Sequence, residues 1–163
     1  DWAIVSEVEQ NDDVLFKPLF SYEMVGICSK DHPLANKEVW QAEDFAEETW
    51  VTYPVPDDML DLYRQVLKPK GINPPRRTTE LTIALIQLVA SRRGIATVPY
   101  WAALPYLEKG YVVARKITEE GLYSNLYAAI RKEDANLAYI EDFHQTVKAQ
   151  SFSTLPGLSV LEL

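Results

Sequence analysis

The pattern of apolar and polar positions is most regular in the stretch from Thr79 to Trp101. Apolar residues at helical spacing form one stripe there, which consists of Leu81, Ala84, Leu85, Leu88 and Val89. Such a stripe is typical of a helix that packs one face against a core. Thr79 is the expected N-cap, Glu80 places negative charge at the helix start, and Gly94 is expected to end the helix in the left-handed conformation. Residues 95–98 follow as a short buried strand, so the stretch predicts half of a βαβ unit in a parallel sheet.

The same patterns along the rest of the chain predict strands and helices in alternation. The expected extended segments are residues 1–6, 14–29, 49–53, 76–79, 111–115 and 123–131. The expected helices are residues 42–48, a segment that begins at Asp57 and ends before Pro69, residues 100–108, and residues 137–149 with a core stripe of Leu137, Ile140, Phe143 and Val147. Successive strand–helix pairs between residues 49 and 115 predict a doubly wound α/β sheet.

Composition and charge narrow the class of protein. The 163 residues are enough for one domain or two small lobes with a buried core. The formal net charge of -8 repels phosphate backbones, so this segment is not expected to bind nucleic acid itself. No apolar run approaches the roughly 20 residues that span a bilayer, and no membrane contact is expected. The single cysteine, Cys28, excludes an internal disulfide, fits a reducing compartment and is expected to be buried.

Three loops carry the residues that we expect to bind a small molecule. In open α/β sheets, ligands bind beyond the carboxyl ends of the strands, close to the N-termini of helices. The candidates at such positions are Tyr53, Pro54, Val55, Pro56, Thr79, Glu80, Thr82, Pro99 and Tyr100. A purely structural interpretation stays open, because prolines also end strands and threonines also cap helices.

The sequence carries little that is typical of an enzyme or a metal site. It contains no glycine-rich phosphate loop, no nucleophile elbow and no catalytic triad motif. His32 has no second ligand at metal spacing and is expected in a turn, while His144 is expected at a surface or interface. The acidic pairs at residues 57–58 and 119–120 are interpreted as solvated charge. We therefore expect no catalysis, no metal and no cofactor.

Several motifs occur in the order and at the spacing found in one protein family. They read Asp-Trp-Ala-Ile-Val-Ser at residues 1–6, Lys-Pro-Leu-Phe followed by Glu23 at 17–23, His-Pro-Leu-Ala at 32–35, and Gln-Leu-Val-Ala-Ser-Arg-Arg-Gly-Ile-Ala at 87–96 followed by Val98 and Pro99. Ordered matches of this kind are much more specific than any one motif. The chain resembles the effector-binding domain of LysR-type transcriptional regulators.

This resemblance implies two Rossmann-like lobes joined by crossover strands, as in type II periplasmic binding proteins. Residues 1–22 with 122–150 would form an incomplete first lobe, residues 23–121 the second lobe, and residues 151–163 a C-terminal tail. The last residue of the first motif, Ser6, often faces the cleft between the lobes in this family. The family also implies a cytoplasmic homodimer or homotetramer that contacts DNA only through a separate N-terminal winged helix-turn-helix, which this chain lacks.

Within the family, residues 52–63 and 79–94 are similar to the activators of methionine biosynthesis, whose co-effector is homocysteine. This chain has Ser-Arg-Arg-Gly at residues 91–94 where that group has Ser-Gly-Arg-Gly. The difference lies at a helix end and leaves the ligand assignment unchanged.

The chemistry of homocysteine agrees with the candidate residues. Its ammonium group needs a carboxylate, which Glu80 offers, and its carboxylate needs donors, which Ser6 and Thr82 offer. Its thiol arm needs apolar walls, which Tyr53, Val55 and Pro99 supply. The competing interpretation is a type II periplasmic solute-binding protein for a small amino acid or anion, which shares the two-lobed architecture. An enzyme on a similar scaffold would need a catalytic pair that the sequence does not show.

Overall fold

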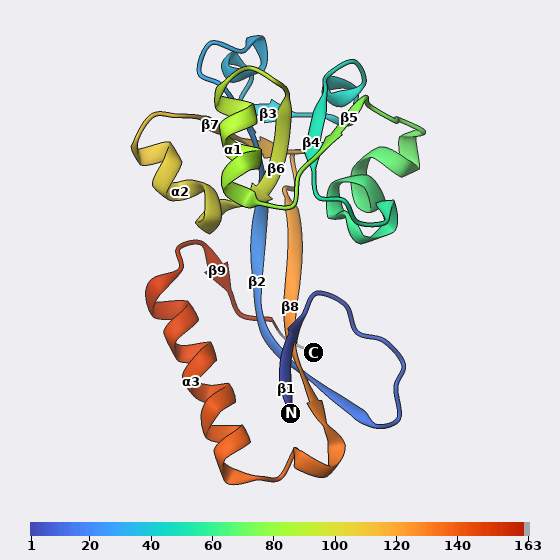
Figure 1. Cartoon of the computed structure of the whole chain (residues 1–163), viewed down its shortest axis with the longest axis vertical. Helices are drawn as coiled ribbons and strands as arrows, with labels where there is room; N and C mark the ends of the chain where they lie inside the picture. Colours follow the sequence, from blue (N-terminus) through green and yellow to red (C-terminus); the bar gives the residue numbers. More distant parts are fainter. Residues whose placement is uncertain (162–163) are drawn as a thin grey trace. The chain divides into compact units, whose positions relative to one another are not determined.

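The computed structural model describes residues 1–161, which form two compact α/β units (Figure 1). Unit 1 consists of Asp1–Tyr22 together with the residues from Tyr123 onward, and unit 2 consists of Glu23–Leu122. The α/β fold class expected from the sequence is confirmed. None of the helices within residues 1–161 combines the length and the apolar character needed to cross a membrane.

Unit 2 is built on a mixed sheet whose parallel part was expected from the sequence. The strands β4 (Trp50–Thr52), β5 (Arg76–Thr78) and β6 (Ile95–Pro99) run parallel, and β4 lies between the other two. The C-terminal part of β2 (Val14–Cys28) is antiparallel both to β6 and to β7 (Val113–Ile117). The two-residue strand β3 (Val39–Trp40) extends the sheet by running parallel to β7.

Both faces of this sheet are covered. Neighbouring residues of a strand point to opposite sides, so each strand contributes side chains to both faces. On one face, α1 (Thr82–Ala90) and α2 (Tyr100–Glu108) cover a cluster that includes Val51, Leu85, Ile86, Val89, Ala96, Val98 and Ala103. The other face carries a second cluster with Trp40, Phe45, Trp50, Leu62, Leu67, Ile95 and Ile117. Trp50 and Val51 therefore enter different clusters, and unit 2 has the doubly wound architecture expected.

Short helical turns replace two of the expected helices. The helix expected at residues 42–48 is reduced to η2 (Ala42–Phe45), and η1 (Pro33–Asn36) precedes it. The single helix expected between Asp57 and Pro69 is wrong. It is divided into η3 (Asp57–Met59), the π-helical η4 (Tyr63–Leu67) and η5 (Lys68–Lys70). The wider π-helical turn, with its i→i+5 bonds, allows Leu62 and Leu67 to enter the same core cluster.

The ends of α1 also differ from the expectation. Thr79 is not the N-cap, because its amide continues the ladder by donating to the carbonyl of Thr52 at 3.0 Å, and Leu81 is the N-cap instead. The left-handed residue after the helix is Arg92, with a φ of 59°, rather than Gly94, whose φ is 150°.

Unit 1 contains the strand β1 (Trp2–Val5), all of β8 (Leu122–Arg131) except its first residue, the turn η6 (Lys132–Asp134) and the helix α3 (Ala138–Thr154). β8 lies between β1 and β2, and β1 and β8 are antiparallel. The described part of residues 151–163, expected as a C-terminal tail, contains regular secondary structure. α3 continues to Thr154, and β9 (Leu158–Ser159) pairs with β2. An edge-on contact between Phe152 and Phe20, with ring centroids 6.3 Å apart, gives this segment an apolar anchor.

The buried face of α3 differs from the expected stripe. Ile140 is buried as expected, but Leu137 is 39% exposed and Phe143 is 49% exposed. His144, which was expected at a surface or interface, is buried with 4% of its surface exposed. The helix therefore buries the polar residue His144, although the apolar pattern indicated that the adjacent Phe143 would be buried.

Candidate functional site

The carboxyl ends of three parallel strands bring most of the candidate residues to one edge of the unit 2 sheet. Residues 53–56 follow β4, residues 79–81 follow β5, and α2 begins directly after β6. Because β5 and β6 each pair with β4 in parallel, the three loops lie beside one another along this edge (Figure 1). Such an edge is where open α/β sheets bind their ligands.

A hydrogen bond between two hydroxyl groups connects the first two loops. The Tyr53 hydroxyl and the Thr82 hydroxyl lie 2.6 Å apart, and either can be the donor. Thr82 is the first residue of α1, where the partial positive charge of the helix dipole is concentrated. The N-cap residue, Leu81, has no side-chain acceptor for the amides of the first turn. This corner of the site therefore presents hydroxyl and amide donors suited to an anionic group.

The loop after β4 is tight and largely apolar. The amide of Val55 donates to the carbonyl of Tyr53 at 2.9 Å, which closes a three-residue turn around Pro54. Pro54, Val55 and Pro56 are exposed, whereas Tyr53 is half-buried and packs against the cluster beneath α1. The loop thus offers an apolar surface that begins at Tyr53.

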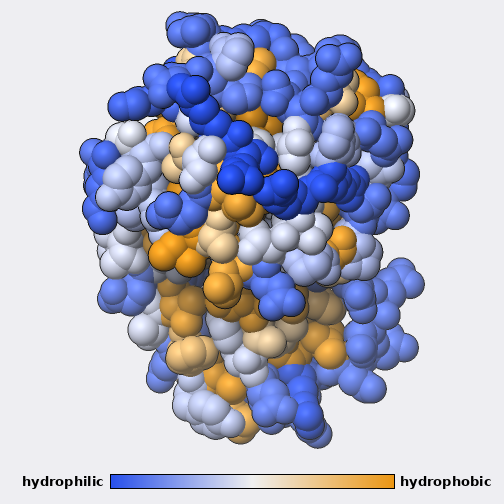
Figure 2. Space-filling view, turned by 45° about the horizontal axis from the view of Figure 1, so that its top comes forward, coloured by the Kyte–Doolittle hydropathy of each residue, from blue (hydrophilic) through white to orange (hydrophobic). Residues whose placement is uncertain are grey.

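Further apolar side chains are exposed near the start of α1. Leu81 is 62% exposed and Ile83 is 56% exposed, although both are large and apolar. Figure 2 shows that one face of the molecule carries apolar areas between hydrophilic ones. Burying apolar area from a ligand is favourable at such positions.

Glu80 is the acidic residue of the site. It is exposed and forms no hydrogen bond or ion pair with any residue between 1 and 161. It precedes α1 by two residues and so lies outside the first helical turn, which contains no acidic residue. Glu80 directly precedes the N-cap, so its carboxylate lies close to the positive end of the α1 dipole, and it is also available to a cationic group.

The remaining candidates have different surroundings. Pro99 is the N-cap of α2, and Tyr100 is the first residue of that helix; both are half-buried. Tyr100 packs against the same apolar cluster as Tyr53. Thr79 accepts a long hydrogen bond, 3.5 Å, from the amide of Leu81. Ser6 follows β1, is exposed, and belongs to unit 1 rather than to unit 2.

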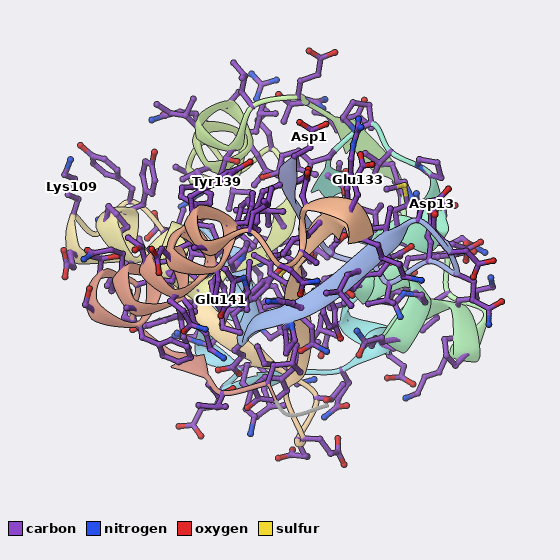
Figure 3. The ribbon with its side chains drawn as sticks, turned by 90° about the horizontal axis from the view of Figure 1, so that it is seen from below. Asp1, Asp13, Lys109, Glu133, Tyr139 and Glu141 are labelled. Atoms are coloured by element: carbon purple, nitrogen blue, oxygen red, sulfur yellow. The ribbon has the colours of Figure 1, made fainter. Side chains whose placement is uncertain are left out.

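Unit 1 has a hollow that the sequence patterns did not indicate. Its volume is about 490 Å³, and its lining residues are Asp12, Asp13, Val14, Arg131, Lys132 and Glu133. Figure 3 labels Asp13, which directly precedes β2, and Glu133, in η6. The lining carries charges of both signs, and none of the candidate residues contributes to it. The only signal in the sequence was a polar loop, which does not distinguish a hollow from an ordinary surface turn.

The histidine and cysteine of unit 2 have structural roles. The His32 Nδ1 accepts from the Leu34 amide at 3.1 Å and caps η1, while its Nε2 lies 3.2 Å from the Glu48 carboxylate. Burial raises the pKa of Cys28 to about 11, so its thiol stays protonated and is a poor nucleophile. Among residues 1–161 no group of three or more histidine, cysteine, aspartate or glutamate side chains is arranged to hold a metal ion.

With this geometry established, comparison with known families decides the class of protein. The model of the LysR substrate binding domain matches residues 1–151. The chain belongs to this family. The two-lobed α/β fold of LysR regulatory domains, which resembles type II periplasmic binding proteins, is thereby confirmed as its fold class.

Individual relatives of this LysR domain are regulators named MetR. It is 84% identical over 163 residues to the HTH-type transcriptional regulator MetR of Haemophilus influenzae, covering 100% of the chain and 53% of that protein. It is 35% identical over 162 residues to MetR of Escherichia coli K12, covering 99% of the chain and 51% of that protein. The chain thus spans about half the length of these relatives. The regulatory domain of MetR from Neisseria meningitidis has a TM-score of 0.93 and 64% identity, with 99% of this chain and 75% of that chain covered.

Proposed function

We propose that this LysR substrate-binding domain is the effector sensor of a transcriptional activator and binds homocysteine to control methionine biosynthesis genes. The observation that carries the proposal is the arrangement at the start of α1. There the hydrogen-bonded hydroxyls of Tyr53 and Thr82 lie next to an acidic residue, Glu80, which has no partner among the described residues. An amino acid needs this combination, because it presents a carboxylate and an ammonium group on one carbon atom.

Each part of homocysteine has a matching group on this edge of unit 2. The ligand carboxylate accepts from the first amides of α1 and from the Thr82 hydroxyl. The ammonium group pairs with Glu80, and this pairing separates amino acids from simple carboxylic acids. The thiol arm contacts the apolar surfaces of Tyr53, Val55, Pro99 and Tyr100. Ser6 and Thr79 remain in the proposal as further hydroxyl contacts, Ser6 on the family resemblance alone.

Regulation then follows from a difference in affinity. Homocysteine biases the regulator toward one arrangement only if it binds that arrangement more tightly than the other. The acidic chain leaves DNA contact to a separate domain, in a cytoplasmic homodimer or homotetramer. No catalytic step is part of this function. The similarity to MetR regulators supports this assignment over a periplasmic solute-binding protein.

Calorimetric titration of the full-length regulator with homocysteine tests the proposal. Thr82→Val removes a donor to the carboxylate and Glu80→Gln removes the partner of the ammonium group, so each is expected to weaken binding by about tenfold or more. Lys70→Gln is the matched control, since among residues 1–161 Lys70 forms an ion pair only with the exposed Glu43, 2.8 Å away in η2. Absence of binding to the folded wild-type protein would remove homocysteine as the ligand.

A further inference from the structure

The apolar loop of the proposed site is held at both of its ends. At its start, the Tyr53 hydroxyl is bonded to Thr82, as described above. At its end, η3 begins with Asp57, and the Asp57 carboxylate forms an ion pair with the guanidinium of Arg76. Between these two points, residues 54–56 are exposed.

Arg76 reaches this loop from the neighbouring strand. It is the first residue of β5, and the parallel register places it opposite Trp50 of β4. The central carbon of its guanidinium lies 5.0 Å from the Trp50 ring centroid and 5.2 Å from the Tyr63 ring centroid. The side chain is only 25% exposed although it carries a full charge. One planar cation thus connects β4, η3 and η4, which a lysine ammonium cannot do in the same way.

We propose that Arg76 is a positioning residue for the effector site, which holds the Pro54–Pro56 loop in its binding conformation through Asp57. Arg76 does not touch the effector in this proposal; it acts on the apolar wall that the effector contacts. The inference rests on the proposed function, since it assigns a role in the affinity of that same site.

The loop needs such an anchor because it has few bonds of its own. η3 is a single turn, closed by the amides of Met59 and Leu60, which donate to Pro56 and Asp57 at 3.0 Å each. A segment with few buried contacts opens locally at low cost in free energy. If Arg76 did not restrain it, part of the binding energy would be spent on ordering the loop.

The test compares Arg76→Gln, Arg76→Lys and Lys70→Gln in the full-length regulator. We expect Arg76→Gln to weaken homocysteine binding by about tenfold, which corresponds to about 1.4 kcal/mol. Arg76→Lys keeps the charge opposite Asp57 but loses the stacking, so it should recover part of the affinity. Lys70→Gln should bind like the wild type, because its ion pair with Glu43 lies in other elements.

Hydrogen–deuterium exchange of residues 53–60, without ligand, separates positioning from general stability. The amides of Val55, Met59 and Leu60 should exchange faster in Arg76→Gln, while those of β4 stay as protected as in the wild type. Wild-type affinity and unchanged exchange in Arg76→Gln would overturn the inference. So would a loss of affinity accompanied by equally faster exchange throughout unit 2, which a purely structural role predicts. If the wild type does not bind homocysteine, the proposed ligand is wrong, and the exchange comparison still decides whether Arg76 holds the loop.

Discussion

Gly94 lies where the chain that leaves α1 passes close to the start of β4. A Cβ atom added at this position would be 2.3 Å from the carbonyl oxygen of Thr49 and 2.9 Å from a methyl group of Val51. The same carbonyl accepts from the amide of Ile95 at 2.9 Å, so it cannot move away without losing that bond. The φ of Gly94, 150°, is also one that other residues rarely adopt.

Gly94→Ala is therefore expected to lower the free energy of unfolding by about 2–4 kcal/mol, through overpacking and backbone strain together. Gly110→Ala is the matched control. Its φ of 69° carries backbone strain as well, but an added Cβ would meet no atom within 4 Å. Denaturant unfolding of both variants should show the larger loss for Gly94→Ala, and equal losses would contradict the close contact as its cause.

This glycine also illustrates what a sequence can reveal about single residues. The pattern of α1 predicted that Gly94 has a special conformation, but attributed it to the left-handed end of the helix. That conformation belongs to Arg92, and the requirement at Gly94 comes from Thr49, which is distant in the sequence. A contact between two segments with no common periodicity cannot be inferred from either segment alone.

At the level of elements, α3 is the helix whose packing the sequence misassigned. Periodicity identifies the apolar residue Phe143 as buried, yet tertiary packing turns the adjacent polar residue His144 inward. Phe143 instead packs edge-on against Trp2, with ring centroids 5.0 Å apart, and stays half exposed. The parallel order of β4, β5 and β6 was predictable, because each strand is followed by a helix or turn that starts a return crossover.

The inward position of His144 predicts a pH dependence of stability. Burial lowers the pKa of His144 in the folded protein; Lys17 on β2 and Lys148 on α3 act in the same direction, and Glu141, labelled on α3 in Figure 3, opposes them. The unfolded chain therefore binds a proton as the pH falls through about 6.5, the ordinary histidine pKa, whereas the folded protein binds it only at a lower pH. Stability should be full above that pH and fall on acidification, by at most about 1.4 kcal/mol per pH unit from this one group.

His144→Gln isolates this contribution, because it removes the titrating group and keeps a polar side chain of similar size. Unfolding by urea should be measured for both proteins between about pH 7 and pH 5. The stability of the wild type relative to the variant should fall as the pH falls, because every ionisable group other than His144 is common to both proteins. A difference that stays constant with pH would contradict a buried neutral imidazole at this position.

The candidate site was predictable to the extent that it follows from strand direction. Tyr53, Thr82 and Tyr100 were chosen because they follow strands expected to be parallel, and those strands do end at one edge. Arg76 was not recognised, because in the sequence it is one of two adjacent arginines after a pair of prolines. Only the register with Trp50 and the fold of η4 against β5 bring the two aromatic rings to its guanidinium.

At the scale of the whole chain, the division into two units allows a prediction of which unit the proposed ligand stabilises. The candidate residues other than Ser6 belong to unit 2, so homocysteine should stabilise unit 2 directly. Trp40, Trp50 and Trp101 lie in unit 2, whereas Trp2 is the tryptophan of unit 1. In a Trp2→Phe variant, tryptophan fluorescence therefore reports on unit 2 only, and the replacement keeps an aromatic ring against Phe143.

Urea unfolding of Trp2→Phe, followed by tryptophan fluorescence, should move to higher denaturant concentration when homocysteine is added. A ligand that binds only the folded state at one hundred times its dissociation constant adds about 2.7 kcal/mol to the free energy of unfolding. Glu80→Gln in the same background should remove most of this gain at the same ligand concentration, while Lys70→Gln should keep it. Because linkage holds wherever binding is confined to the folded state, a fluorescence transition unmoved by a ligand already shown to bind would place its site outside unit 2.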